Sequence, residues 1–188
     1  KFHAKIGSVS ASGKNLSLNN SNVIVYTSSK APAQTWRFDR QSDGSYIIIN
    51  QKTGDVLSVA GNGTASGTNV QLGKNTGAKG QKWFIYEKNG KYSLRPACAT
   101  GCALNVTTGA TADMPNIQIA TKNSANTQQF TITKGAFVDL VAPADVGTDF
   151  IANISNVNAG LNLSLNGNNV VIDTASNAAA QKFKFERQ

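Results

Sequence analysis

A short motif, a glutamine two residues before an aromatic residue, occurs four times in this chain at nearly constant spacing. The copies are Gln34-Thr35-Trp36, Gln81-Lys82-Trp83, Gln128-Gln129-Phe130 and Gln181-Lys182-Phe183. The first three copies are 47 residues apart and the fourth follows after 53. A fixed period of this length is typical of a chain built from repeated supersecondary units. The motif therefore constrains the architecture more than any other feature of the sequence.

Each of the first three repeats contains four short stretches in which apolar and polar residues alternate. In the second repeat these stretches are residues 46–48, 56–59, 70–72 and 83–85, separated by turns rich in Gly and Asn. Alternation with a period of two predicts β-strands with one buried face. Three repeats of four strands predict twelve strands in total. The aromatic residues of the motif are expected in the core, and not as platforms for a sugar.

The junctions between repeats predict how the repeats pair. Asp43-Gly44 and Asn89-Gly90 each separate the last strand of one repeat from the first strand of the next. Such dipeptides supply the positive φ angles that two-residue hairpins require. We therefore expect antiparallel pairing across each junction. Repeats joined in this way can close on themselves and leave no exposed sheet edge.

This combination of motifs resembles the ricin-B-type lectin family, especially its bacterial carbohydrate-binding members. The nearest copy of the family pattern runs through residues 55–59, 67–72 and 81–83, which read Asp-Val-Leu-Ser-Val, Gly-Thr-Asn-Val-Gln-Leu and Gln-Lys-Trp. The resemblance implies an all-β fold, a β-trefoil of three four-stranded lobes around a pseudo-threefold axis. It covers residues 1–133 as a complete unit.

The fourth copy of the motif restarts the first lobe. Residues 15–19, Asn-Leu-Ser-Leu-Asn, return unchanged at 162–166, and Phe38-Asp39-Arg40-Gln41 returns as Phe185-Glu186-Arg187-Gln188. We expect a complete trefoil over 1–133, a linker over 134–149 with Pro and Gly breaks, and the first lobe of a second trefoil over 150–188. A single lobe does not bury its own apolar face. Residues 150–188 are therefore expected to pack on the trefoil or on another chain.

The resemblance also implies a sugar pocket in each lobe, built from an Asp on the second strand, a Gln and an aromatic residue on the third, and an Asn near the Gln-x-Trp motif. In the order of the lobes, the Asp position holds Ser17, Ser58, Asn105 and Ser164. The Gln position holds Ile24, Gln71, Gln118 and Val171, and the aromatic position holds Tyr26, Gly73, Ala120 and Asp173. No lobe has the full set, and lobe three keeps the most hydrogen-bonding capacity.

The candidates for binding carbohydrate are Asn105, Gln118, Ser58, Asn69, Gln71, Ser17 and Tyr26. The structural core positions are Gln34, Trp36, Gln81, Trp83, Gln128, Phe130, Gln181 and Phe183. As alternatives, Gln71 and Gln118 are ordinary outward strand residues and Tyr26 only covers its hairpin.

Charge is unevenly distributed along the chain. Residues 1–133 hold 14 Lys or Arg against 5 Asp or Glu, whereas residues 134–188 hold 4 against 5. A basic surface attracts acidic glycans, nucleic acids and anionic lipids. The lysines are scattered singly, with no basic helix or aromatic RNA-binding motif, so a nucleic-acid partner is not expected. The alternative is a soluble surface that happens to be rich in Lys.

The cysteines and the single histidine bear on three possibilities: a disulfide, a metal site and acid–base catalysis. Cys98 and Cys102 either close a small disulfide loop, which implies an oxidising compartment, or remain as two reduced thiols. With His3 as the only histidine, neither a metal site with three or four ligands nor acid–base catalysis is expected. No cofactor is expected.

No segment approaches the roughly 18 consecutive apolar residues of a membrane span, so membrane insertion is not expected. No signal peptide is recognisable at Lys1, and we expect either that one has been removed or that the chain comes from a longer polypeptide. The sequence favours a non-catalytic carbohydrate-binding module of a larger secreted or cell-surface bacterial protein, with weak, multivalent binding to glycans and a preference for acidic ones. The alternative is a structural or protein-interaction trefoil whose sugar pockets have degenerated.

Overall fold

A computed structural model describes residues 1–107 and 114–135, together with strand residues 149–152, 155–156, 161–166, 169–174 and 183–186. The chain divides into two compact units, Lys1–Val138 and Asp139–Gln188. The predicted linker, residues 134–149, lies mostly outside the described residues, so the boundaries expected at 133 and 150 stay predictions.

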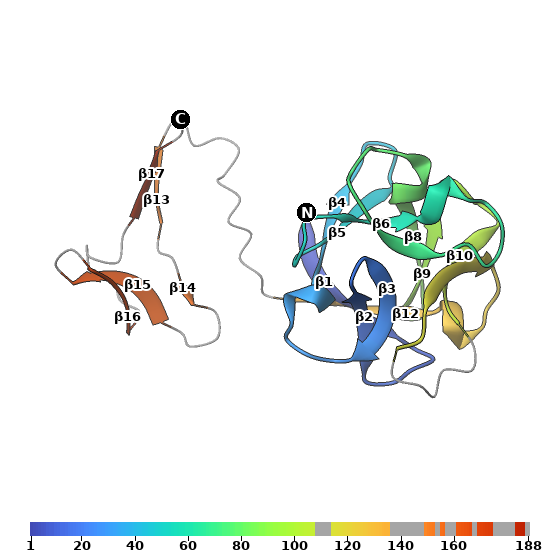
Figure 1. Cartoon of the computed structure of the whole chain (residues 1–188), viewed down its shortest axis with the longest axis horizontal. Helices are drawn as coiled ribbons and strands as arrows, with labels where there is room; N and C mark the ends of the chain where they lie inside the picture. The colour runs from blue at the N-terminus through green and yellow to red at the C-terminus, as the bar shows by residue number, and fades with distance from the viewer. Residues whose placement is uncertain are drawn as a thin grey trace. The chain divides into compact units, whose positions relative to one another are not determined.

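The first unit is all-β (Figure 1). Its described residues form twelve strands, as the three repeats predict, and four short 3-10 helices. The strands are β1 (Phe2–Ser8), β2 (Lys14–Asn19), β3 (Asn22–Thr27), β4 (Trp36–Arg40), β5 (Tyr46–Asn50), β6 (Val56–Val59), β7 (Val70–Gly73), β8 (Lys82–Lys88), β9 (Lys91–Pro96), β10 (Cys102–Val106), β11 (Ile117–Thr121) and β12 (Phe130–Lys134). The 3-10 helices are η1 (Pro32–Gln34), η2 (Ala60–Asn62), η3 (Lys79–Gln81) and η4 (Asn126–Gln128). We call β1–β4, β5–β8 and β9–β12 lobes one, two and three.

Six of these strands close into a barrel. β1 pairs with β4, β4 with β5, β5 with β8, β8 with β9, β9 with β12, and β12 returns to β1. Every pairing is antiparallel, and the contact between first and last strands removes the open edge that an unclosed sheet would leave. The other six strands form three hairpins, β2–β3, β6–β7 and β10–β11. This is the topology of a β-trefoil, which confirms the predicted fold of the first unit.

Three asparagines, one from each lobe, join these hairpins in a closed ring of hydrogen bonds. Asn22 Nδ2 donates to Asn116 Oδ1 at 2.8 Å, Asn116 Nδ2 to Asn69 Oδ1 at 2.9 Å, and Asn69 Nδ2 to Asn22 Oδ1 at 3.0 Å. The residues are 47 apart, which is the period of the repeated motif. The ring therefore lies on the pseudo-threefold axis.

Backbone hydrogen bonds repeat the same symmetry. Val25 N donates to Pro115 O, Leu72 N to Ser21 O and Ile119 N to Thr68 O, at 2.8–2.9 Å. Each lobe thus donates to the lobe that its ring asparagine also contacts. Closure around the axis is fixed by main chain and side chains together.

The core is built from the aromatic motif residues. Trp36, Trp83, Phe130 and Phe38 are fully buried, and the indole Nε1 of Trp83 donates to Leu57 O at 2.9 Å. A buried aromatic side chain contributes a large apolar area to the core. Gln181, in the fourth motif, lies outside the described residues, and Phe183 is described only as part of a strand.

The two predicted tight turns differ. Asn89 and Gly90, between β8 and β9, both have positive φ angles, 54° and 72°, as a two-residue hairpin requires. At the other junction only Gly44 has a positive φ, 83°. Gly44 N donates to Gln41 O and Gln41 N to Ser45 O, which makes a longer loop. The prediction of a two-residue turn was therefore wrong at Asp43-Gly44.

The second unit contains five described strands: β13 (Asp149–Ala152), β14 (Ser155–Asn156), β15 (Leu161–Asn166), β16 (Asn169–Thr174) and β17 (Phe183–Glu186). Phe150 pairs with Phe185 and Ala152 with Phe183, as Phe2 pairs with Phe38 and Ala4 with Trp36 in lobe one. The β15–β16 hairpin likewise repeats the register of β2–β3. That this unit begins a second trefoil, and what it packs against, stay predictions.

Candidate functional site

The glutamine of each repeated motif holds the loop that precedes it. Gln81 Nε2 donates to Lys74 O at 2.7 Å, seven residues earlier, and Gln81 Oε1 accepts from Thr76 N at 2.8 Å, five residues earlier. Gln34 makes the same pair of bonds with residues 27 and 29, and Gln128 with residues 121 and 123. All three side chains are buried. The motif glutamines are thus structural, and they fix the loop between the third and fourth strands of each lobe.

In lobe two this loop borders a cavity of about 190 Å³. β6 and β7 form one side, with Ser58 directly opposite Gln71 in the strand register. Asn62 of η2, Thr76 of the loop and Gln81 of η3 complete the polar lining. Two of the predicted site residues, Ser58 and Gln71, are therefore brought together at one cavity.

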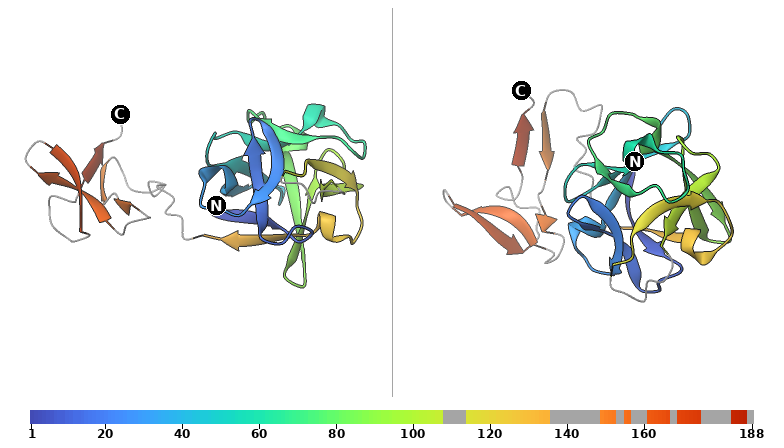
Figure 2. Two further views of the ribbon diagram at one scale, coloured as in Figure 1. Left: turned by 60° about the horizontal axis from the view of Figure 1, so that its bottom comes forward. Right: turned by 45° about the vertical axis from the view of Figure 1, so that its right-hand side comes forward.

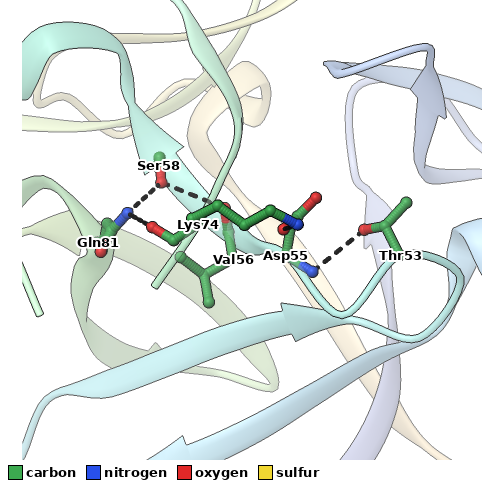
Figure 3. A network of polar contacts seen from close by, with 6 residues as sticks. All are labelled: Thr53, Asp55, Val56, Ser58, Lys74 and Gln81. Carbon is green, nitrogen blue, oxygen red and sulfur yellow. Dashed lines mark hydrogen bonds and ion pairs between the residues drawn. The ribbon is translucent and has the colours of Figure 1, made fainter. Parts of the chain in front are cut away.

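The polar groups of the cavity divide into engaged and available ones. Ser58 Oγ donates to Val56 O at 3.2 Å and accepts from Gln81 Nε2 at 3.1 Å, which fixes the hydroxyl (Figure 3). Asn62 Oδ1 accepts from Gly80 N at 2.7 Å, whereas the amide nitrogen of Asn62 and the whole amide of Gln71 have no hydrogen bond to another described residue. Both side chains are exposed. The cavity thus offers amide donors and acceptors on a rigid frame.

An ion pair closes the far end of the same network. Lys74 Nζ lies 2.7 Å from Asp55 Oδ1, and Asp55 N donates to Thr53 Oγ1 at 3.2 Å (Figure 3). The Lys74 carbonyl oxygen, in turn, accepts from Gln81. The Lys74 side chain is 85% exposed, so the pair contributes about 0–1 kcal/mol to stability. Neither charged group lines the cavity.

The aromatic position of lobe two is Gly73, and the geometry gives a reason for the small residue. A Cβ atom added at Gly73 would lie 3.0 Å from Ser58 Oγ and 3.6 Å from Gln81 Nε2. A larger side chain would therefore press on the hydrogen-bonded pair behind it. Glycine keeps the cavity open but leaves it without an aromatic surface for a sugar ring to pack on.

Lobe three arranges its candidates differently. Asn105 and Gln118 lie opposite each other on β10 and β11, but Asn105 is buried and its Nδ2 donates to Val106 O at 2.9 Å. That bond consumes part of the hydrogen-bonding capacity expected of Asn105. Gln118 is half-buried. In lobe two, by contrast, the serine and glutamine of the predicted pocket line one cavity.

The remaining candidates do not converge. Ser17 is buried opposite Ile24, whereas Tyr26 is 45% exposed and lies opposite Asn15. Asn69 was also a candidate, but both ends of its amide bind ring asparagines. Its side-chain oxygen and nitrogen thus both take part in joining the lobes.

Both cysteines are free thiols in the structure. Cys98 Sγ donates to Gly63 O at 3.6 Å and Cys102 Sγ to Thr64 O at 3.7 Å. Each thiol thus binds a different carbonyl of the segment after η2, and the reduced alternative replaces the disulfide candidate. Burial, with a smaller effect of neighbouring Cys102, raises the pKa of the Cys98 thiol.

Sequence reasoning missed Asn62 and Thr76. A signal was present for Asn62, because it follows Gly61 just after a strand, and both residues have positive φ angles, 59° and 54°. Asn and Gly are the residues that tolerate this conformation. Within the described part of the chain, no group of three or more His, Cys, Asp or Glu could hold a metal ion, and no helix is long and apolar enough to cross a membrane.

Comparison with protein families gives one match, to the ricin-type beta-trefoil lectin domain-like family, over residues 4–73 and 79–175. A search of curated proteins found no significant match.

Solved structures similar to this chain include lectins and a toxin. The designed threefold-symmetric protein ThreeFoil shares 28% identity with a TM-score of 0.66, over 70% of this chain and 97% of ThreeFoil. A ricin B-like lectin from Macrolepiota procera, solved in complex with lactose, shares 19% identity with a TM-score of 0.62, over 71% of this chain and 95% of the lectin. A mosquitocidal holotoxin shares 20% identity with a TM-score of 0.66, over 97% of this chain but 22% of the toxin. The latter two likenesses show the fold alone.

Proposed function

The chain belongs to the ricin-type β-trefoil lectin domain-like family, and we propose that it is a non-catalytic carbohydrate-binding module whose main site for neutral sugars is the lobe-two cavity. The observation that carries this proposal is the composition of the cavity. Among the described residues it is lined by the hydroxyls of Ser58 and Thr76 and the amides of Asn62, Gln71 and Gln81, with no titratable side chain. Ser58, Lys74 and Thr76 occupy the Gln81 amide, so the amides of Asn62 and Gln71 are the ones open to a sugar. Uncharged donors and acceptors suit the hydroxyl groups of a sugar. General acid–base chemistry needs a proton-transfer group, and this lining has none.

Binding to this cavity is weak and gains strength through multiplicity. No aromatic side chain in the described part of the chain lines it, and an apolar contact of that kind supplies much of the affinity of ligand sites. We expect a dissociation constant on the order of millimolar for a monosaccharide. Linked copies of such a module would raise avidity through effective concentration.

The wider setting is also proposed. Family membership and the excess of basic residues in 1–133 are consistent with a larger secreted or cell-surface bacterial protein, with acidic glycans among its ligands. The match to 22% of the holotoxin supports the idea that such units occur inside larger proteins. Any catalytic activity would then belong to other parts of that protein.

A second candidate function is a structural or protein-interaction trefoil. Gly73 at the aromatic position and Ser58 at the acid position favour it, because both changes remove sugar contacts. The two functions differ in one measurable respect, since only a carbohydrate-binding module binds small sugars in solution.

Calorimetric titration with galactose, lactose and N-acetylglucosamine tests the proposal. Gln71→Ala should abolish binding because it removes one of the two exposed amides of the cavity, whereas Gln118→Ala is the matched control at the equivalent position of lobe three. Equal loss in both variants, or loss in the control alone, would place the site elsewhere. The affinity expected for such a site is weak, so each sugar is titrated to roughly tens of millimolar. If no sugar binds at that concentration, the result favours the protein-interaction trefoil.

A further inference from the structure

A second and larger cavity, of about 460 Å³, lies between the β8–β9 hairpin and the loop before β12. It is separate from the lobe-two cavity and shares no lining residue with it. The hairpin, coloured yellow-green, extends well past the barrel (Figure 2, left). The volume falls within the range of about 300–1,000 Å³ typical of small-ligand sites.

One face of the hairpin supplies a basic wall. Tyr86 pairs with Ser93 and Lys88 with Lys91 in the antiparallel register. Side chains alternate between the two faces of a strand, so these four residues and Arg95 share one face, and all five line the cavity. The two lysines are exposed.

Arg95 is held in place with a donor unused. Its guanidinium carbon lies 4.0 Å from the centroid of the Tyr86 ring, a cation–π contact that fixes the plane of the group. Its Nε atom is buried and has no hydrogen-bond partner among the described residues. Buried polar atoms are almost always paired. The Arg95 guanidinium lines the cavity and donates no hydrogen bond to a described residue, so it keeps charged donors for an acceptor there.

The local charge favours an anion. Lys88, Lys91 and Arg95 line the cavity, and among the residues that the structure describes no acidic one does. The nearest acid in sequence, Glu87, alternates to the other face of β8, and its Oε1 accepts from Gly90 N at 2.6 Å. The three positive charges are therefore not neutralised by a carboxylate within the cavity.

The opposite wall is polar and rigid. Asn123 N donates to Gln128 Oε1 at 2.8 Å, and Gln129 Nε2 donates to Ser124 O at 2.7 Å. Asn123 Oδ1 accepts from Ala125 N, which leaves the Asn123 amide nitrogen as a donor without a partner among the described residues. Uncharged donors therefore face the basic wall across the cavity.

We propose that this cleft is a second carbohydrate site, specific for an anionic saccharide, a hexose ring that carries a carboxylate or a sulfate. Arg95 and the two lysines bind the anionic group, the exposed half of Tyr86 packs on the ring, and the Asn123 loop binds ring hydroxyls. The saccharide class rests on the proposed function, whereas the preference for an anion rests on the cleft alone. Three cations within one cavity suit a single anionic group, and a nucleic acid strand would require a longer basic track.

The test uses the whole chain and five probes: galactose 6-sulfate, glucuronic acid, galactose, inorganic sulfate and a short oligonucleotide. Each is titrated at low salt and followed by NMR. Both anionic sugars are expected to bind more tightly than galactose at this cleft, with affinity falling as salt rises. Arg95→Gln should weaken anionic binding about tenfold or more, since hydrogen bonds to charged groups are the stronger ones. Lys91→Gln, at the exposed start of β9, should weaken it severalfold without threatening the fold. Arg40→Gln is the control for an exposed arginine outside the cleft.

The outcomes show whether the cleft binds anionic sugars independently of the lobe-two cavity. If Gln71→Ala abolishes galactose binding and leaves anionic binding intact, the sites are independent and the inference stands. If only glucuronic acid or only galactose 6-sulfate responds to Arg95→Gln, the cleft is assigned to that anion. Anionic binding that survives both cleft variants overturns the inference but not the lobe-two site. Equal affinity for inorganic sulfate, or tighter binding to a short oligonucleotide, overturns the saccharide class.

Discussion

The amide nitrogen of Asn69 donates a 3.0 Å hydrogen bond to Oδ1 of Asn22, a residue 47 positions earlier in the chain. Asn116 completes the ring by donating to Asn69 and accepting from Asn22. Each asparagine begins or precedes the third strand of its lobe. The 47-residue period of the sequence therefore places one equivalent asparagine from each lobe at the axis where the three lobes meet.

Removing one ring asparagine should destabilise the trefoil. Asn69→Ala removes two of the three hydrogen bonds and leaves partners in Asn22 and Asn116 unsatisfied, at a cost of about 1–3 kcal/mol in the free energy of unfolding. Chemical denaturation measures this change. Gln71→Ala, two residues along, has no such bonds and should stay within about 0.5 kcal/mol of the parent chain. Equal stability of the two variants would mean that the ring contributes nothing.

The motif glutamine should also matter for stability in lobe one, outside the cavity proposed to bind sugar. Gln34 Nε2 donates to Thr27 O at 2.8 Å, and its Oε1 accepts from Ser29 N at 2.8 Å and from Asn15 at 3.3 Å. Gln34→Ala leaves these buried partners without a hydrogen bond. It should lower the free energy of unfolding by about 2 kcal/mol or more. Thermal and urea unfolding check the value, with exposed Gln51→Ala as the control. If Gln34→Ala lowers the free energy of unfolding no more than the control does, the motif glutamine does not stabilise the fold.

Asp43 should titrate well below the usual range. Hydrogen bonds from the Ser45 hydroxyl at 2.6 Å and the Ser45 backbone, followed by Lys82, hold the pKa of Asp43 at about 2, below its ordinary 3.8. Because the folded-state pKa is depressed, the associated stabilisation is present above the ordinary pKa and is lost as the pH falls towards 2. Ser45→Ala should raise the pKa more than Lys82→Gln does, as carboxyl chemical shifts would show. An Asp43 pKa near 4 in the parent chain would contradict these contacts.

The cysteines should react as thiols of different accessibility. Denatured protein should contain two titratable thiols, because neither forms a disulfide. In the folded protein alkylation at neutral pH should be slow at Cys98, whose pKa is raised by burial, since the thiolate is the reactive form. The rate should increase as the pH rises. A count of zero thiols in non-reduced, denatured protein would restore the disulfide.

The fold was predictable because its determinants are local and repeated. Gln81 binds atoms five and seven residues earlier, so the sequence shows the whole interaction within one motif. Strand alternation likewise indicates that Trp83 faces the core. The Asn22–Asn69 bond was not predictable, because alternation does not specify which turns meet on an axis.

The candidate site was predictable only in part. Ser58 and Gln71 lie on adjacent strands in one hairpin, and their pairing follows from the strand pattern. Asn62 and Thr76 come from loops whose paths depend on positive φ angles and on buried hydrogen bonds. The hydrogen bond that occupies Asn105 is also invisible in a strand pattern. The sequence placed most hydrogen-bonding capacity in lobe three, whereas the cavity proposed to bind sugar lies in lobe two.

Chemical-shift mapping of the ¹⁵N-labelled chain during a galactose titration tests the central claim most directly. The account predicts that backbone amides of Ser58, Gln71 and Thr76 shift together, with one dissociation constant, and that Gln71→Ala removes these shifts. Chemical-shift changes confined to lobe one or lobe three would contradict the account. So would the absence of any change at roughly tens of millimolar galactose, which is the affinity range expected for such a site.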